Sequence, residues 1–446
     1  MKKNRKLSPS QIIPLSFLAM IVLGTVLLML PFATKDGMGA PLETALFTAT
    51  SASCVTGLVL QDTARYWTLF GQLVILCLIQ VGGMGVVTMA VIISIFSGKK
   101  IGLKERWVMQ ESISAPQVGG IIRMTGMILK TTLFVELAGA VLLAIGFRGQ
   151  MGLGKGLWYG LFHSVSAFCN AGFDLMGTKE AFSSLTAFSA NPLVIVTVVL
   201  LILVGGIGFA TWKDVKEFHF RVNRYSQQSK IILVTSLILV LGGFAFLFFY
   251  EFARPQWLDM SMGQRALAAL FQAVTPRTAG FNTVDLNAMS GPGQLMVLFF
   301  MLIGGAPGST AGGFKMTTIA VLVLCIRGAF RGKESVEAFG RRVPDPSVRN
   351  AAAVFIMYVL LFLGVGTVIC CIDGVGLMPA LFEAASAVAT VGLSLGITAQ
   401  LSTVSHILLI LLMFFGRVGG LTLIYAVSAG DGPTGAKLPL GRVIVG

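Results

Sequence analysis

The chain has 446 residues, of which 55% are hydrophobic and only 12% are charged, and its mean hydropathy is +0.85. Soluble proteins carry about 25% charged residues, so this composition indicates a polytopic membrane protein and argues against a soluble one. The net charge of +14 does not indicate a nucleic-acid partner, because the sequence has no Lys/Arg-rich tract interleaved with aromatic residues.

The N-terminal part of the chain contains a unit that later recurs. The uncharged run Ile12–Pro31 is long enough to span about 30 Å of hydrocarbon, whereas the apolar segment Leu42–Ser53 is too short to cross it. The pentapeptide Cys54–Leu58 follows, and the uncharged run Trp67–Phe96, interrupted by Gly82-Gly83-Met84-Gly85, completes the unit. This pattern predicts an outer membrane helix, a re-entrant half-helix, an extended segment and an inner membrane helix.

Three degenerate copies of the unit follow. Each has an [AG]-L-F triplet in its half-helix and a glycine nine or ten residues after that phenylalanine, and these glycines recur every 108 to 115 residues. Outer helices are expected near Ile121–Phe147, Ile231–Tyr250 and Ala351–Ile372, half-helices from Leu157, Arg265 and Met378, and inner helices over Pro192–Trp212, Leu286–Ile326 and His406–Ala429.

The expected fold is therefore an all-α polytopic membrane protein built from four tandem repeats, with eight transmembrane helices around one pseudo-fourfold pore. We place the repeats at residues 1–118, 119–228, 229–346 and 347–446, the last including a C-terminal tail. Lys and Arg concentrate in alternate loops, with 23 on one side and 8 on the other. The positive-inside rule then predicts that both termini are cytoplasmic and that the half-helices enter from the outside.

The four extended segments are expected to bind a cation. Non-helical backbone at membrane depth is tolerated only where it is buried in protein or lines an aqueous cavity, and inward carbonyls replace the hydration shell of an ion. The side chains beside the glycines are neutral, which favours an alkali cation over a divalent one. The alternative is that these glycines only permit tight helix packing. The expected filter residues are Val55, Thr56, Gly57, Asn170, Ala171, Gly172, Thr278, Ala279, Gly280, Thr390, Val391 and Gly392.

The third inner helix is expected to break in mid-membrane, because five glycines and one proline lie within Gly304–Gly313. The alternative is a simple kink. Arg417 occupies a position of the Gly-Gly-x-Gly landmark in the fourth repeat, so repeat symmetry predicts that it faces the axis below the filter. There it would repel cations or donate to loop carbonyls, unless it extends to the cytoplasmic edge. The direction of Lys315 remains open.

These features resemble the Ktr/Trk/HKT superfamily of potassium transporters, in particular the membrane subunits of bacterial Ktr systems. The resemblance covers essentially the whole chain, and Thr275–Asn282 is its most specific part. It implies K⁺ as the transported ion, because all four filter positions are glycine and a serine at the first is associated with sodium preference. It also implies an intramembrane gate made of Gly304, Gly305, Ala306, Pro307, Gly308, Ser309, Thr310, Ala311, Gly312, Gly313 and Lys315, with Arg417.

The resemblance further implies a bacterial plasma-membrane location and a homodimer within the lipid bilayer. A cytosolic ring of nucleotide-binding regulatory subunits is expected to dock on the basic loops 97–118, 213–230 and 327–349, since this chain has no nucleotide-binding motif of its own. The apolar stretch Leu438–Gly446 is a candidate for the dimer interface. No organic cofactor is expected, and Na⁺ coupling is left open.

Two other classes of function compete with a channel-like transporter. An alternating-access, Na⁺-coupled cation carrier requires an acidic residue at the midplane, and no unpaired candidate is evident. An intramembrane enzyme requires a Ser–His, paired-Asp or metal-binding constellation, and none is visible. The acids Asp62, Asp174 and Asp285 follow filter glycines and either concentrate cations at the outer mouth or are ordinary loop acids. Glu136 is expected to pair with Lys130 or Arg123.

Overall fold

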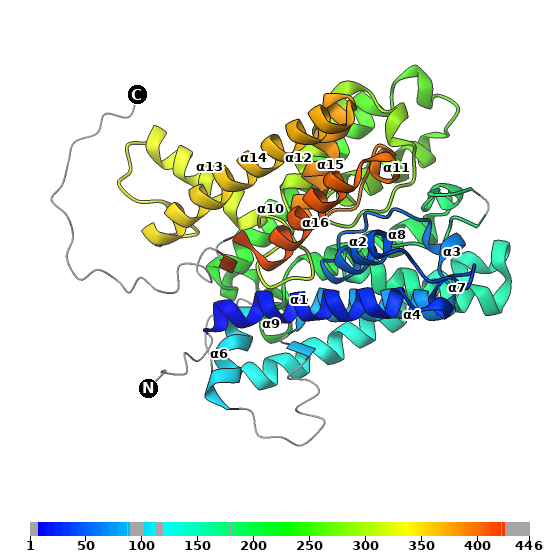
Figure 1. Cartoon of the computed structure of the whole chain (residues 1–446). Helices are drawn as coiled ribbons and strands as arrows, with labels where there is room; N and C mark the ends of the chain where they lie inside the picture. The colour runs from blue at the N-terminus through cyan, green and yellow to red at the C-terminus, as the bar shows by residue number, and fades with distance from the viewer. Residues whose placement is uncertain are drawn as a thin grey trace, which may run out of the picture.

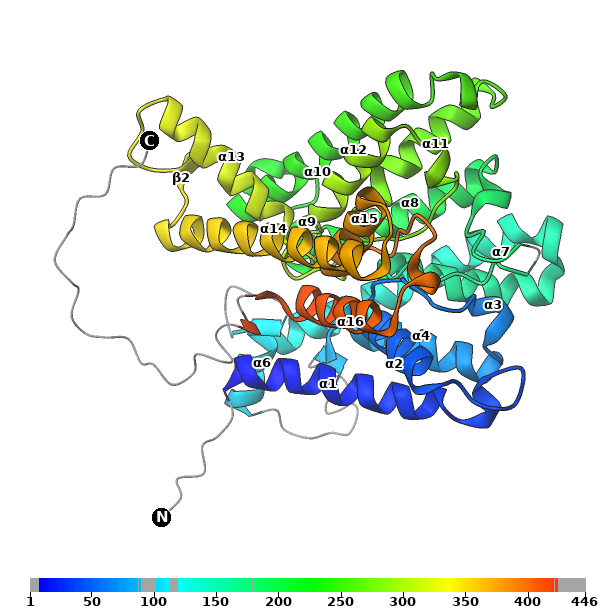
Figure 2. The same ribbon diagram turned by 45° about the horizontal axis from the view of Figure 1, so that its top comes forward.

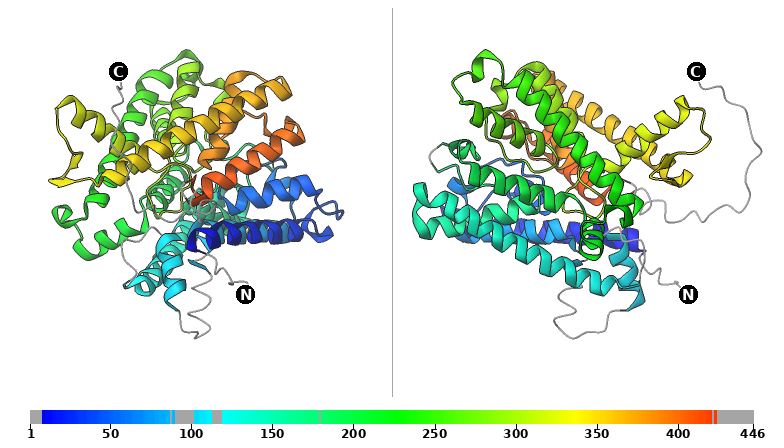
Figure 3. Two further views of the ribbon diagram at one scale, coloured as in Figure 1. Left: turned by 60° about the vertical axis from the view of Figure 1, so that its left-hand side comes forward. Right: turned by 180° about the vertical axis from the view of Figure 1, so that it is seen from behind.

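The computed structural model describes residues 8–86, 88–89, 102–112, 119–178, 180–420 and 422–423. The described chain is mainly helical, and its long helices run roughly alongside one another (Figure 1). The helix α13 and the start of α14 extend as an arm beyond the other helices (Figure 2, and the right-hand view of Figure 3). The basic residues of the N-terminus, much of the loop 97–118 and the stretch Leu438–Gly446 lie outside the described residues.

The first two predicted repeats form the half of the chain coloured blue to green. The first contains α1 (Pro9–Leu28), α2 (Leu42–Ser53), α3 (Thr63–Tyr66), α4 (Leu69–Met84) and α6 (Leu103–Ser112). The second contains α7 (Ile121–Phe168), α8 (Pro192–Gly206) and α9 (Phe209–Phe218). The long α7 combines the outer helix with the half-helix, and Gly152, at φ +75°, is the non-helical residue between them.

The last two predicted repeats have the same order of outer helix, half-helix and inner helix, except that the inner helix of the third is divided into α12 and α13. The third contains α10 (Gln227–Phe246), a π-turn (Leu247–Glu251), α11 (Met262–Val274), α12 (Gly291–Leu302), α13 (Met316–Phe330) and the strands β1 (Glu337–Ala338) and β2 (Arg341–Arg342), which pair antiparallel. The fourth contains α14 (Asp345–Asp373), α15 (Leu377–Ala389) and α16 (Thr403–Val418). Short 3₁₀ turns lie at Pro31–Ala33, Thr186–Phe188, Val222–Arg224, Pro255–Trp257, Leu286–Ala288 and Thr398–Gln400.

Within the described residues, four helices are long and apolar enough to cross a membrane, and they correspond to the four predicted outer helices. Their ranges are Gln11–Leu28, Ile121–Phe168, Gln227–Glu251 and Asp345–Asp373, and α8 with α9 makes a fifth span if that bent pair is counted as one. The predicted inner helices are shorter. The structure therefore supports a membrane protein with several apolar helices.

The prediction of a continuous inner helix over Pro192–Trp212 was wrong. The helix α8 ends at Gly206, and α9 departs at an angle of 97°. The break follows from Gly208, which has φ +86°, a conformation that only glycine adopts at little cost. The helices α4 and α16 end in the same way. Each is followed by the last glycine of its landmark, Gly85 with φ +86° and Gly419 with φ +90°.

In three repeats, the first glycine of the landmark lets the inner helix pack directly against the end of a half-helix. A Cβ atom on Gly82 would collide with the carbonyl oxygen of Ser53, and the same holds in the second and fourth repeats for Gly205 against Phe168 and Gly416 against Val388. Any larger residue would push the inner helix away. The landmark thus fixes both the closest approach of two helices and the point where one of them ends.

Candidate functional site

Each half-helix is followed by the same unusual backbone. A residue in the left-handed region comes two positions before the glycine, and the glycine itself has a positive φ. The φ values are 52°, 56°, 70° and 53° at Val55, Asn170, Thr278 and Thr390, and 94°, 69°, 80° and 91° at Gly57, Gly172, Gly280 and Gly392. Valine and threonine are rare in this region because they are β-branched, so these three instances, matched by Asn170 in the second repeat, mark a conformation imposed by the surrounding fold.

The four glycines lie against one another in a closed ring. A Cβ atom on Gly57 would be 2.5 Å from the carbonyl oxygen of Ala171, and one on Gly172 would be 2.9 Å from that of Ala279. Gly280 meets the carbonyl oxygen of Val391, and Gly392 meets that of Thr56, in the same way. The peptides therefore follow each other around the ring in chain order. A side chain at any of the four positions would intrude on the neighbouring carbonyl.

One cavity lies at the ring and another lies at the intramembrane loop. A cavity of about 240 Å³ is lined by all four glycines together with Asp174 and Asp285. A cavity of about 360 Å³ is lined by residues of the intramembrane loop, Tyr358 and Arg417. Asp62 has another role, because its carboxylate accepts the backbone N–H groups of Ala64, Arg65 and Phe182 at 2.8–2.9 Å.

The intramembrane loop joins α12 to α13 and lies against the second repeat. The chain leaves the helix after Leu302 and resumes it at Met316. The N–H of Ala306 donates to the carbonyl of Gly206 at 2.8 Å, and the Thr310 hydroxyl donates to the carbonyl of Phe168 at 3.0 Å. The loop is thus held where α8 and the second half-helix end.

The far end of the loop lies below the fourth extended segment. A Cβ atom on Gly312 would collide with the Thr390 hydroxyl, and one on Gly313 would be 3.0 Å from the carbonyl oxygen of Ala389. The Lys315 ammonium folds back and donates to the carbonyls of Ala311 at 2.6 Å and Gly312 at 3.2 Å. The close contacts of Gly312 and Gly313 leave no room for a side chain at these two positions.

Arg417 connects the loop to the first repeat. Its guanidinium donates to the Thr310 carbonyl in the loop and to the carbonyls of Gly82 and Gly83 at the end of α4, the last at 3.0 Å. The side chain is half-buried and lines the cavity on the loop side of the ring. Of the roles considered for this arginine, the geometry matches hydrogen bonding to loop carbonyls.

Two polar sites behind the ring differ from expectation. Glu136 does not pair with Lys130 or Arg123; its carboxylate accepts from the Gln80 amide at 3.3 Å and from the Cys169 thiol at 3.9 Å. This is because the buried face of α7 turns Glu136 toward α4.

Four buried hydroxyl residues also lie behind the ring and were absent from the predicted site, namely Ser51, Ser166, Thr275 and Ser386. Their spacing of five or six residues before each ring glycine was the available signal.

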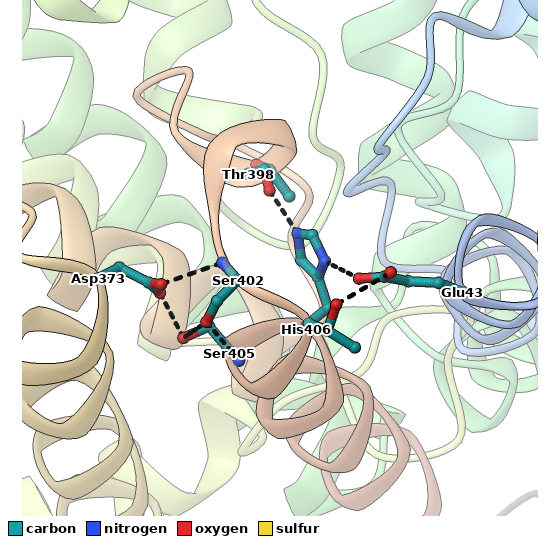
Figure 4. A network of polar contacts seen from close by, with 7 residues as sticks. Glu43, Asp373, Thr398, Ser402, Ser405 and His406 are labelled. Carbon is teal, nitrogen blue, oxygen red and sulfur yellow. Dashed lines mark hydrogen bonds and ion pairs between the residues drawn. The ribbon is translucent and has the colours of Figure 1, made fainter.

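A polar network ties the first and fourth repeats together beside the half-helices (Figure 4). His406, at the start of α16, contacts the Glu43 carboxylate through Nδ1 at 2.6 Å and the Thr398 carbonyl through Nε2 at 2.8 Å. Asp373 accepts from the Ser402 N–H and the Ser405 hydroxyl. Across the described ranges, no group of three His, Cys, Asp or Glu side chains is arranged to hold a metal ion.

Comparison with known proteins identifies the family. The family described as TrkH, cation transport protein, matches residues 3–430. The potassium/sodium uptake protein NtpJ of Enterococcus hirae is 36% identical over 100% of this chain and 99% of its own length. The Ktr system potassium uptake protein B of Bacillus subtilis is also 36% identical, over 99% of this chain and 97% of its own.

A solved structure has the same fold. The potassium transporter TrkH of Vibrio parahaemolyticus superposes with a TM-score of 0.73, covering 95% of this chain and 86% of that one, at 21% identity. The agreement of fold with full-length sequence similarity places the chain among transporters and not among enzymes. The chain belongs to the TrkH family of cation transport proteins.

Proposed function

We propose that this chain is the ion-translocating membrane subunit of a K⁺ uptake system, and that K⁺ passes in a channel-like manner through the ring of four glycine peptides. The observation that carries the proposal is the closed ring of four glycine peptides, all of which line one cavity. Backbone carbonyls in such a ring would replace the hydration shell of a monovalent cation. The carboxyl ends of the half-helices add a favourable partial negative charge.

The choice of K⁺ is supported by similarity and by the chemistry of the ring. Relatives of full-length similarity are named as potassium uptake proteins, and one is named for both potassium and sodium. All four ring positions are glycine and the neighbouring side chains are uncharged, which suits a weakly hydrated alkali cation. We propose the same twelve filter residues as above, with Na⁺ as a competing or coupled ion.

We propose the loop Gly304–Lys315 and Arg417 as the gate. The loop lines the cavity on one side of the ring and approaches the fourth filter segment at Gly312. It is held by hydrogen bonds to two other repeats, to Gly206 and Phe168 of the second and to Arg417 of the fourth. Ions that leave the ring on this side would pass the loop, so its displacement would control flow.

Assembly and orientation complete the proposal. Both termini are placed in the cytoplasm of a bacterial cell, the membrane subunit is a homodimer, and a cytosolic nucleotide-binding ring docks on the basic loops. Support for docking comes from two of these loops, which lie side by side: the Gln227 amide donates to the carbonyls of Ala338 and Arg341 at 3.0 and 3.1 Å. The B-type relatives are named as parts of a Ktr system.

Isotope flux into vesicles containing the purified protein tests the proposal. K⁺ and Rb⁺ are expected to flow down their gradients, faster than Na⁺, without an imposed Na⁺ gradient. Saturable uptake that requires a Na⁺ gradient would favour the alternating-access carrier instead. The absence of K⁺, Rb⁺ and Na⁺ flux, with and without a nucleotide-binding partner, would contradict the proposal.

A further inference from the structure

Each half-helix carries one buried hydroxyl residue at an equivalent place. Ser51, Ser166 and Ser386 come six residues before the ring glycine, and Thr275 comes five before it in the repeat that is one residue shorter. All four residues have 0% exposure, so their hydroxyls require partners within the protein. Those partners lie in the extended segments that form the ring.

The backbone carbonyl of each hydroxyl residue binds the peptide that comes just before one ring peptide. It accepts the N–H of the residue just before the ring glycine at 2.8 Å from Thr56, Ala171 and Val391 and at 2.9 Å from Ala279. These are the residues whose own carbonyl oxygens lie against the ring glycine of the neighbouring repeat. The carbonyl of each of these residues shares its planar peptide with the N–H of the ring glycine, so the bond to the residue's own N–H holds that residue in place without by itself fixing the direction of its carbonyl.

The side-chain hydroxyl makes a second contact on the other side of the same turn. Ser51 and Ser386 accept the N–H groups of Gly57 and Gly392, each at 3.0 Å. Ser166 donates to the carbonyl of Phe173 at 2.7 Å, and Thr275 donates to that of Phe281 at 2.5 Å. In every repeat, one residue thus grips the extended segment at two points around the glycine.

We propose that these four hydroxyls are positioning residues that set ion selectivity by holding the ring carbonyls in place. The left-handed residues Val55, Asn170, Thr278 and Thr390 strain each segment, and strained backbone persists only where its surroundings constrain it. The hydroxyls supply part of that constraint. Ring carbonyls that could move would adapt to a smaller ion, so discrimination between K⁺ and Na⁺ depends on these hydrogen bonds. This inference rests on the proposed role of the ring as the filter.

The direction of the hydrogen bonds predicts an order of effects. Removing the hydroxyl of Ser51 leaves the buried N–H of Gly57 without a partner, and removing that of Ser386 does the same to the half-buried N–H of Gly392. Removing that of Ser166 leaves a carbonyl oxygen short of one bond. A buried N–H has a single hydrogen-bonding opportunity, whereas an under-satisfied carbonyl is better tolerated. The alanine variants of Ser51 and Ser386 should therefore loosen selectivity more than that of Ser166.

The test is the ratio of K⁺ to Na⁺ flux in vesicles. Ser51→Ala and Ser386→Ala are each expected to lower this ratio by about two- to tenfold, the range that corresponds to one net hydrogen bond. Ser386→Thr, which keeps a hydroxyl, is expected to retain most of the ratio. Ser53→Ala is the matched control, because it removes a buried hydroxyl from the same half-helix that has no hydrogen-bond partner among the described residues.

Gly172→Ser distinguishes a failure of the proposed filter from a failure of the proposed positioning role. If it lowers the ratio while Ser51→Ala and Ser386→Ala leave the ratio at the wild-type value, the ring is the filter and the positioning role is refuted. If Gly172→Ser also has no effect, the filter assignment fails and this inference fails with it. A change in Ser53→Ala equal to that in Ser51→Ala would likewise refute the role, because it would show a nonspecific packing effect.

Discussion

Replacing Arg417 with alanine should raise ion flux, because it removes the side chain that links the loop to α4. The guanidinium donates to Thr310 in the loop and to Gly82 and Gly83 in the first repeat. A hydrogen bond from a charged group contributes about 1.5–3 kcal/mol. Loss of the single bond to the loop would therefore shift the closed-to-open ratio by roughly ten- to a hundredfold. Water in the adjoining cavity can replace part of the lost bond, so we expect a flux increase of about tenfold.

The assay is Rb⁺ influx into vesicles at matched protein density. Arg417→Lys should give an intermediate flux, since a lysine keeps the charge but cannot bridge the same three carbonyls. Arg265→Ala is the control, because its guanidinium donates to the Leu258 and Met260 carbonyls before α11. Flux equal to or below that of the wild type in folded Arg417→Ala would refute the reasoning. Equal flux in Arg417→Lys and the wild type would show that charge, and not hydrogen bonding, controls the gate.

Three further predictions address the ring, the loop and the polar network. Gly172→Ser should reduce discrimination between K⁺ and Na⁺, because Gly172 has φ +69° and a Cβ there would be 2.9 Å from the Ala279 carbonyl oxygen. Competitive flux of the two ions measures this discrimination. An unaltered ratio of K⁺ to Na⁺ flux would count against the filter. Shortening the loop within residues 306–314 should raise Rb⁺ flux, because its contacts with α8 and the fourth segment would be lost; unchanged flux would remove the loop from the gate. His406→Ala should lower the melting temperature in detergent, because a side chain that is 5% exposed loses two hydrogen bonds, which reduces the free energy of unfolding by about 1–3 kcal/mol. Glu43→Gln, which keeps an acceptor, should have a smaller effect. Equal melting temperatures of His406→Ala and the wild type would refute the stabilising role of the network.

Much of the architecture could be predicted because it depends on local sequence. The first half-helix was expected at Leu42–Ser53 and has those bounds, since a proline precedes this short apolar segment and a glycine-containing turn follows it. Three of the four outer helices followed from long uncharged runs, which have few other stable conformations in a membrane, and the one near Ile121–Phe147 followed from the repeat. The interruption between Leu302 and Met316 followed from its glycines and proline.

The inner helices could not be predicted from their apolar runs. Hydropathy continues through Gly208, but a left-handed glycine and the close packing of Gly205 on the second half-helix end the helix. The left-handed conformation of Val55 and its three counterparts was equally hidden, because these residues favour other conformations by themselves. Glu136 was paired wrongly because side chains one helical turn apart were considered and a partner on another helix was not.

The sequence by itself predicted four copies of one membrane unit, a glycine in each extended segment, a broken third inner helix and an arginine where charge is costly. Those features are local or periodic, so composition and spacing reveal them. Only the tertiary structure decided that the four glycines close a ring in chain order and that Arg417 joins Thr310 to Gly82. These contacts link residues more than a hundred positions apart, and packing between repeats selects them.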